Sequence, residues 1–218
     1  MNFNVIRKDK MNNTEKIRRI QLRESIESQC KSSIEEKITR YLEIEHQGII
    51  GNHYFAKASS ECIYLYRDGY FIGAVMMSHA INEGIIKFIA ERNFINRQKE
   101  NGDTKTIEGL INEFKERKII SNECAEALTK IWKSFRADIH HMNPPVSTIP
   151  FTKVAQQNLK CLSTIEREIF GHDINNGAIV PHQPKYWDIN KDGTMTVFLR
   201  LEYNYMITCF KGRLFTAA

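Results

Sequence analysis

Apolar residues recur at helical spacing along most of the chain, and the clearest case begins after Ser59 or Ser60. From there, apolar and small side chains fall three to four residues apart, which is typical of the buried face of a helix. The inward positions are Phe71, Val75, Ser78, Ile81, Ile85 and Phe88. This spacing predicts a single helix of about 30 residues, ending near Arg92, with other elements packed around it.

Shorter stretches on either side of this helix have the same periodicity. Residues 14–30 and 33–46 are rich in charged residues and have only a narrow apolar stripe. We therefore expect two helices that pack this stripe against the main domain. Residues 48–60, with two glycines, predict a loop. Residues 104–117 predict a short helix whose apolar side faces inward.

Two more helices are predicted farther along the chain. Ser121 is a suitable N-cap for a helix that continues to about His141. That helix cannot pass Pro144, because proline removes a backbone donor and clashes with the preceding turn. A long helix is expected over residues 151–170, with Gly171 as its C-terminal stop.

The pattern changes period in the last part of the chain. Tyr186–Ile189 and Met195–Glu202 are rich in β-forming residues, and the Asp192–Gly193 pair between them is typical of a hairpin turn. The sequence therefore predicts a mainly α fold, an antiparallel helical bundle with a small C-terminal β-hairpin.

The length of 218 residues suits one principal domain with an appendage. We expect a helical extension over residues 1–58, the bundle over residues 59–171, and a tail with the β-hairpin over residues 172–218.

Composition and charge narrow the classes of function. The chain has 31 Lys and Arg against 26 Asp and Glu, a net charge of +5 that is spread thinly, so a site for a polyanion must be a local group of side chains. The first residues lack the apolar core of a secretion signal, and no apolar run approaches the ~20 residues of a membrane span. The five cysteines show no paired spacing, as expected of reduced thiols. We therefore expect a cytoplasmic protein that does not contact a membrane.

The segment SFRADIHHM, residues 134–142, is the most informative for chemistry. On a helix, Arg136 and His140 are four residues apart and share a face, whereas His141 lies about 100° further round. Phosphodiester cleavage uses this combination, because an imidazole moves protons and a guanidinium holds the charged transition state. The alternative is a surface helix end whose histidines complement the helix dipole.

The long helix, a shorter helix and then the helix that carries Arg136 resemble the HEPN superfamily, small helical bundles with the signature Arg, four to six residues, His. The resemblance covers about residues 61–171. It implies a metal-independent endoribonuclease, often a toxin or an antiviral-defence effector, whose site forms across a homodimer. Carried over, the motif arginine is Arg136 and the motif histidine is His141.

One position departs from the family pattern. Catalytic members carry Asn, Asp or His directly after the arginine, and here that residue is Ala137. Asp138 comes next and could orient His140 or His141, or pair with Arg136. The candidate catalytic residues are therefore Arg136, His141, Asp138 and His140.

Two hypotheses of function follow from the motif. The first is a metal-independent endoribonuclease that acts as a homodimer on RNA and has an antitoxin or other partner protein. The second is a catalytically inactive HEPN-like module that binds a nucleotide, RNA or a partner protein. No cofactor and no metal are expected, because glycine-rich phosphate loops are absent and the histidines share no established ligand spacing.

Overall fold

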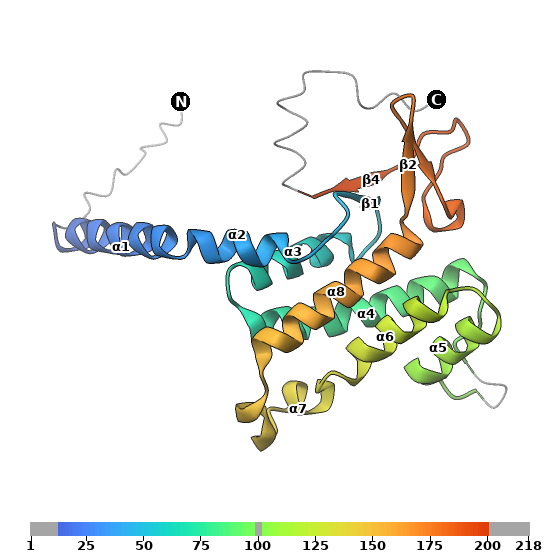
Figure 1. The fold of residues 1–218 in the computed structure, drawn as a ribbon, viewed down its shortest axis with the longest axis horizontal. Coiled ribbons are helices and arrows are strands. Elements are labelled where there is room, and N and C mark those ends of the chain that lie inside the picture. Colours follow the sequence, from blue (N-terminus) through green and yellow to red (C-terminus); the bar gives the residue numbers. More distant parts are fainter. Residues whose placement is uncertain (1–12, 99–101, 201–218) are drawn as a thin grey trace, which may run out of the picture.

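Helix α4 is the centre of the molecule, and other helices pack around it (Figure 1). The computed structural model describes residues 13–98 and 102–200. The main helices are α3 (Ala56–Arg67), α4 (Phe71–Arg92), α5 (Ile107–Glu116), α6 (Asn122–Lys133) and α8 (Phe151–Ile169). Buried residues cover more than half of the circumference of α4, while Ala80, Glu83, Lys87 and Glu91 on the remaining side are half-buried or exposed. The mainly α class predicted from the sequence is confirmed.

The single long helix expected from Ser59 to Arg92 is in fact two helices. The break lies between α3 and α4 at Gly69, whose φ of +89° is a left-handed conformation that glycine adopts without strain. The apolar periodicity continues across the break, because both helices bury residues in the same core. Periodicity alone therefore did not reveal the turn.

The helix expected from Ser121 to His141 is also interrupted. Ser121 is its N-cap, as predicted, and its Oγ accepts a hydrogen bond from the backbone N–H of Cys124 at 3.0 Å. Helix α6 ends at Lys133, and the chain bends at Phe135 before the separate short helix α7 (Arg136–His141). A 3₁₀ helix, η1 (Pro144–Thr148), follows.

Helix α8 ends as the sequence predicted. Its last residue is Ile169, and Gly171 stands just beyond its end. A Cβ atom on Gly171 would lie only 2.5 Å from the carbonyl oxygen of Arg167, so only glycine fits without a shift of the backbone.

The first two helices form an arm that extends from the bundle (Figure 1). Helix α1 (Asn13–Ser32) and helix α2 (Ile34–Leu42) lie end to end, separated by Ser33. Helix α1 buries no residue, whereas α2 packs against α3. The second helix is shorter than expected and ends four residues before His46.

The C-terminal region contains a β-hairpin, but not at the predicted residues. The hairpin consists of β2 (His172–Asn175) and β3 (Ala178–Pro181), which pair antiparallel. The first predicted strand, Tyr186–Ile189, does not form: Tyr186 is the last residue of a 3₁₀ helix, η2 (Pro184–Tyr186), and residues 187–188 are irregular. Around the predicted turn there is one isolated bridge, between Ile189 and Met195. The last two residues of the predicted second strand, Leu201 and Glu202, lie outside the described residues.

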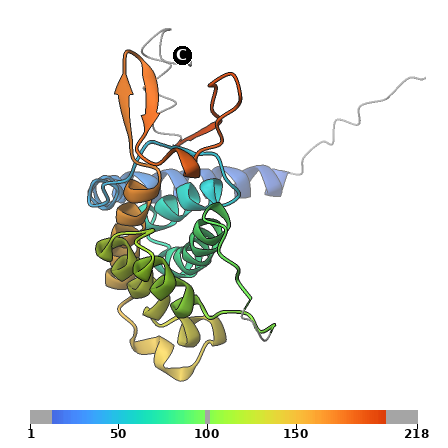
Figure 2. The same cartoon turned by 90° about the vertical axis from the view of Figure 1, so that its right-hand side faces the viewer.

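The remaining strand pairs with a segment that the sequence predicted to be a loop. Strand β4 (Val197–Leu199) runs antiparallel to β1 (Ile49–Gly51), with Phe198 opposite Ile50. The strands gather at one end of the bundle and α7 lies at the other (Figure 2). The β segments are therefore remote from the candidate catalytic residues.

A buried ion pair holds the end of β4 against the bundle. Arg200 and Glu166 of α8 are 1% and 2% exposed, and Arg200 Nη2 lies 2.8 Å from both carboxylate oxygens. Ser59 of α3 donates a hydrogen bond to the same carboxylate and accepts one from Arg200 at 2.8 Å. Both charges are thus compensated by short contacts, as burial requires.

Candidate active site at the junction of α4 and α7

Sharp bends at both ends fix the position of α7. Phe135 before it and Met142 after it have φ values of +57° and +51°, in the left-handed region that bulky side chains rarely adopt. Ile139 is fully buried and packs into the core. Non-glycine residues in this conformation are often found at functional sites, where the surrounding structure holds them.

Arg136 is held against the side of the bundle by two contacts. Its guanidinium lies 4.4 Å from the centre of the Trp132 ring, a cation–π geometry, and its Nη2 is 3.4 Å from Oε2 of Glu83 on α4. The side chain is nevertheless 38% exposed. Five N–H groups form the guanidinium donor set, so the exposed edge retains donors for an anionic ligand.

Glu83 is shared between two cations. Lys87 Nζ lies 2.7 Å from its Oε1, and this hydrogen bond lowers the pKa of Glu83, with a further contribution from Arg136. The carboxylate is therefore ionised at neutral pH and positions Arg136 rather than acting as an acid.

His79 of α4 lies buried behind α7. Its Nε2 is 3.1 Å from the carbonyl oxygen of Ser134 and 2.9 Å from Ser134 Oγ, while Ser134 Oγ donates to the carbonyl of Ile131. With the serine hydrogen already used, His79 Nε2–H is the donor, and the ring is the neutral Nε2–H tautomer. Burial, followed by the charge of His140, lowers the pKa of His79 to about 4.

The ring of His140 lies next to this buried histidine. The two ring centres are 5.6 Å apart with an interplanar angle of 33°, and His140 itself is exposed. Nδ1 of His79 is buried and has no hydrogen-bond partner among the described residues. The charge of Arg136 also lowers the pKa of His79.

A buried polar layer supports the bend between α6 and α7. Asn158 of α8 donates through Nδ2 to Ser134 Oγ and to Ser78 Oγ, each at 2.9 Å. Asn82 of α4 donates to the carbonyl of Leu128 on α6 at 3.1 Å. These bonds connect α4, α6 and α8 directly beneath α7, which gives the site a rigid base.

The other two candidates lie apart from this cluster. Asp138 Oδ1 accepts a hydrogen bond from Asn143 Nδ2 at 3.1 Å, so its contact closes the end of α7 and goes to neither histidine. His141 is exposed and makes no hydrogen bond or ion pair with the described residues. The structure therefore groups Arg136 and His140 with His79, while His141 projects from the end of the helix.

The sequence left the contribution of α4 open: Glu83 could face the helix that carries Arg136, but a solvent-facing charge was the favoured interpretation, and His79 was not a candidate. His79 and Glu83 are four residues apart and so share a face of that helix. They interrupt an otherwise apolar and small-residue stretch, which was a signal that this face meets something polar. The identity of the partner, α7, required the tertiary structure.

Four surface grooves have no residue of α7 in their lining. One of about 970 Å³ is lined by the end of α5, the start of α6 and Lys185, and another runs between α6 and α8 past Lys130 and Lys160. Within residues 13–98 and 102–200, no group of three or more His, Cys, Asp or Glu side chains is arranged to hold a metal ion. None of the helices in those ranges combines the length and apolarity needed to cross a membrane.

The arrangement at α7 suits proton transfer beside a bound anion. The imidazole of His141 is exposed, and that of His140 lies against the buried, neutral ring of His79. The guanidinium of Arg136 is fixed in orientation. Comparison of the chain with protein-family models, with curated proteins and with solved structures found no match.

Proposed function

We propose that the α7 end of the bundle cleaves RNA without a metal ion, as the first hypothesis from the sequence expects. The observation that carries the proposal is the placement of Arg136. Its guanidinium is oriented by Trp132 and Glu83 yet remains 38% exposed, on the same short helix as the exposed His140 and His141. A fixed guanidinium can hold two phosphate oxygens at once.

The proposed cleavage needs two proton transfers, one from the nucleophile and one to the leaving group. A histidine base removes the proton of the ribose 2′-OH, whose oxygen attacks the adjacent phosphorus. The bond from phosphorus to the 5′-oxygen of the next nucleotide breaks, and that oxygen takes a proton from an acid. The products are a 2′,3′-cyclic phosphate and a 5′-hydroxyl. DNA is not cut, because it lacks the nucleophile.

His141 is the proposed base or acid, in keeping with the family motif, and Arg136 stabilises the charged transition state. His140 stands beside His79 and supports the site from the bundle side. Since adjacent residues on a helix diverge by about 100°, one α7 does not aim both histidines at one phosphate. We therefore propose that a second copy completes the acid–base pair across a two-fold axis.

A second candidate function is supported by a different observation. Glu83 already compensates the charge of Arg136, and Ala137 stands where catalytic HEPN members have a polar residue. None of the described grooves is lined by α7. These features favour a HEPN-like module that binds a nucleotide, RNA or a partner protein without cleaving it.

A cleavage assay distinguishes the two. Labelled RNA and DNA oligonucleotides of the same sequence are incubated with the protein in EDTA, and products are identified by their 2′,3′-cyclic phosphate ends. We expect RNA cleavage by the wild type and its loss in Arg136→Ala and His141→Ala. His182→Ala, an exposed histidine in the β-hairpin region, is the matched control and should cleave normally.

Two results would overturn the nuclease. One is intact RNA with the wild type over a range of sequences. The other is full activity in His141→Ala, since a contaminating ribonuclease would produce that pattern. Either result leaves the binding module, which is then tested by titrating the protein with a labelled RNA and with nucleotides.

A further inference from the structure

The side of α4 that the bundle leaves open carries an exposed aromatic side chain. Tyr54, between β1 and α3, is 68% exposed. Its Oη donates a hydrogen bond to the carbonyl oxygen of Gly84 at 2.8 Å, and a Cβ atom at Gly84 would lie only 3.5 Å from the ring. The ring is therefore held against α4 at a residue that has no side chain, while most of its surface stays open to solvent.

This ring lies at the same level of α4 as the contact to Arg136. Gly84 directly follows Glu83, whose carboxylate is 3.4 Å from Arg136 Nη2. Adjacent residues of a helix differ in height by only about 1.5 Å and point about 100° apart. Tyr54 and Arg136 thus lie on the two edges of the open side of α4, and Lys87 falls between these directions one turn further on. A nucleotide whose phosphate contacts Arg136 can extend its base towards Tyr54.

The open side of α4 continues into a groove with basic side chains. The groove has a volume of about 510 Å³ and is lined by the last turns of α4, the start of α5 and the segments 95–98 and 104–105. Three of its lining residues are cationic, Lys87, Arg97 and Lys105, and none is acidic. Lys87 Nζ also lies 2.7 Å from Glu83, so a single carboxylate connects the groove with Arg136.

Arg97 keeps its charge available for a ligand. It is exposed and forms no ion pair within residues 13–98 and 102–200. It lies close to Tyr54, because its charge acts on the hydroxyl: burial and then Glu91 raise the pKa of Tyr54, whereas Arg97 lowers it. The carbonyl of Arg97 accepts a hydrogen bond from the backbone N–H of Lys105 at 2.7 Å, which joins the two segments of the groove wall.

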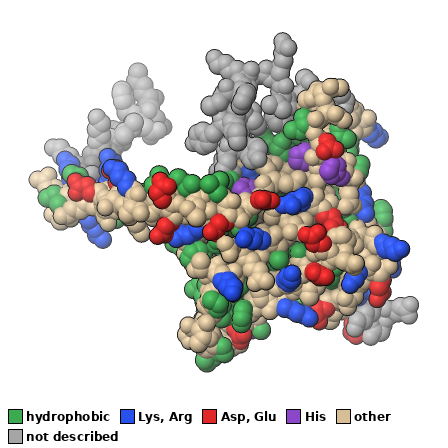
Figure 3. Space-filling view, viewed as in Figure 1, with side chains coloured by type: hydrophobic (Ala, Val, Ile, Leu, Met, Phe, Trp, Pro, Cys, Tyr) green, Lys and Arg blue, Asp and Glu red, His purple; other side chains and the backbone are tan. Residues whose placement is uncertain are grey.

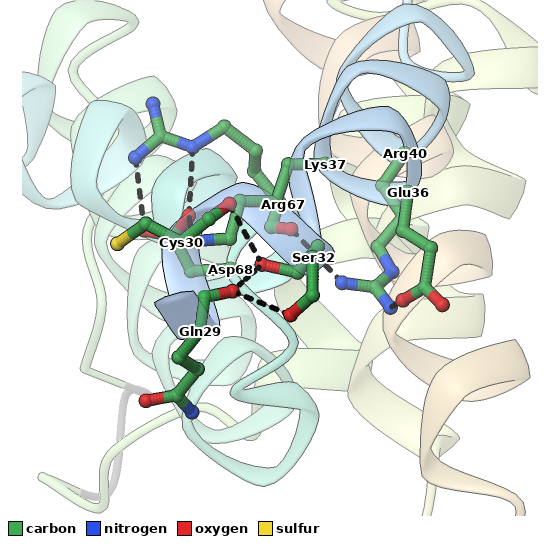
Figure 4. Close-up of polar contacts among 9 residues, drawn as sticks. Gln29, Cys30, Ser32, Glu36, Lys37, Arg40, Arg67 and Asp68 are labelled. Atoms are coloured by element: carbon green, nitrogen blue, oxygen red, sulfur yellow. Dashed lines mark hydrogen bonds and ion pairs between the residues drawn. The ribbon is translucent and has the colours of Figure 1, made fainter. Parts of the chain in front are cut away.

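Basic side chains elsewhere are less suited to a polyanion. Where α2 meets α3, Lys37 Nζ lies 3.5 Å from Asp68 and Arg40 Nη2 lies 2.6 Å from Glu36, so both charges are compensated (Figure 4). Over the face that α8 and α6 present in Figure 1, basic and acidic side chains are interspersed (Figure 3). Of the four described grooves, the one beside α4 alone has cations and no acidic residue in its lining.

We propose that the open side of α4 is a nucleobase-binding subsite for single-stranded RNA. A base next to the scissile bond stacks on Tyr54, and the phosphates that follow lie along Lys87, Arg97 and Lys105. An aromatic side chain can stack on any base, and a duplex keeps the faces of its bases covered, so the subsite selects unpaired strands. This assignment rests on the RNA substrate proposed above and adds the residue that holds the base.

Binding is measured with a strand that cannot be cut. A short fluorescein-labelled RNA with a 2′-O-methyl group on every ribose lacks the nucleophile but keeps its bases and phosphates, and fluorescence anisotropy gives its Kd. Tyr54→Ala and Tyr54→Leu should bind it about tenfold more weakly than the wild type, because a stacked base is lost. Tyr54→Phe keeps the ring and should bind normally. Tyr70→Ala, which removes a 66% exposed tyrosine roughly 20 Å away along α4, is the matched control.

A duplex of the same strand separates stacking from attraction between charges. The wild type and Tyr54→Ala should bind the duplex equally, because its bases are covered. Arg97→Ala should weaken binding to both forms and reduce the slope of log K against log salt concentration by about one. Arg167→Ala, which removes an exposed arginine from α8, is the charge-matched control and should leave that slope unchanged.

Three results would overturn the subsite. They are no binding of the single strand by the wild type, unchanged binding by Tyr54→Ala, and an equal loss by Tyr54→Ala on single strand and duplex. None of these measurements depends on cleavage. Binding that requires Tyr54 without any cut RNA would remove the nuclease and keep the subsite, whereas cleavage with unchanged binding by Tyr54→Ala would remove the subsite and keep the nuclease.

Discussion

His79 should make the stability of the fold sensitive to mild acid. Burial and the neighbouring charge of His140 lower its pKa from the ordinary 6.5 to about 4. The neutral ring donates to Ser134 and thereby fixes the bend before α7. Below pH 6.5 the unfolded chain binds a proton at this residue and the folded chain does not, so unfolding becomes more favourable as the pH falls.

The size of the effect follows from the difference between the two pKa values. Each pH unit within the window costs about 1.4 kcal/mol. Between pH 7 and pH 5 the free energy of unfolding should fall by about 2 kcal/mol through His79, and by about 3 kcal/mol at pH 4. The loss stops below the folded-state pKa, where both states are protonated.

Glutamine is the informative replacement. In the His79→Gln variant, the amide nitrogen of the new side chain can reach the position of Nε2 and keep the donor to Ser134, but it does not titrate. Burial also lowers the pKa of His53, to about 3, so the wild type has a second source of acid sensitivity in the same window. The difference between the wild type and His79→Gln isolates the contribution of His79.

Urea unfolding followed by circular dichroism at 222 nm, at pH 7, 6, 5 and 4, measures this difference. We expect His79→Gln to be less stable than the wild type at pH 7 and to lose about 2 kcal/mol less between pH 7 and pH 5. Identical pH profiles for the two proteins would show that His79 is not buried as a neutral ring. They would also contradict the hydrogen bond from neutral His79 to Ser134.

Further predictions concern the buried ion pair and the candidate site. Arg200→Met should lower the free energy of unfolding by about 3–5 kcal/mol, because it leaves the Glu166 carboxylate buried without its partner. Arg167→Met, whose pair with Glu45 is exposed, should change it by no more than about 1 kcal/mol in the same urea titration. In the RNA cleavage assay, Arg136→Lys should lose nearly as much activity as Arg136→Ala, since an ammonium lacks the planar fork; equal activity of Arg136→Lys and wild type would contradict this role. His140→Ala should retain more activity than His141→Ala, and the reverse order would move the catalytic assignment to the histidine that contacts His79.

The elements that the sequence predicted well depend on local interactions. Ser121 caps α6, and α8 ends just before Gly171, because a cap and a stop involve atoms only a few residues apart. The mainly α class follows from the spacing of apolar residues at the helical period. Each helix has this spacing in its own sequence, so each can be predicted without the others.

The breaks between helices were not predicted, since they do not change that period. Gly69 separates α3 from α4, and Phe135 separates α6 from α7, while apolar residues on both sides enter the same core. Phe135 is a bulky residue in a left-handed conformation, and nothing in the local sequence favours that choice. Its conformation is held by Ser134, which is bonded to His79 and Asn158 on other helices.

The sequence by itself determined that the chain is a helical bundle and that Arg136, Asp138, His140 and His141 fall within one short segment. Only the tertiary structure decided what that segment meets. It placed Glu83 against Arg136 and His79 against His140, although both partners come more than fifty residues earlier in the sequence. It likewise paired β1 with β4 across most of the chain length. Contacts of this kind depend on how helices and strands pack in three dimensions, and a linear pattern of apolar and polar residues carries no record of the distance between segments that are far apart in sequence.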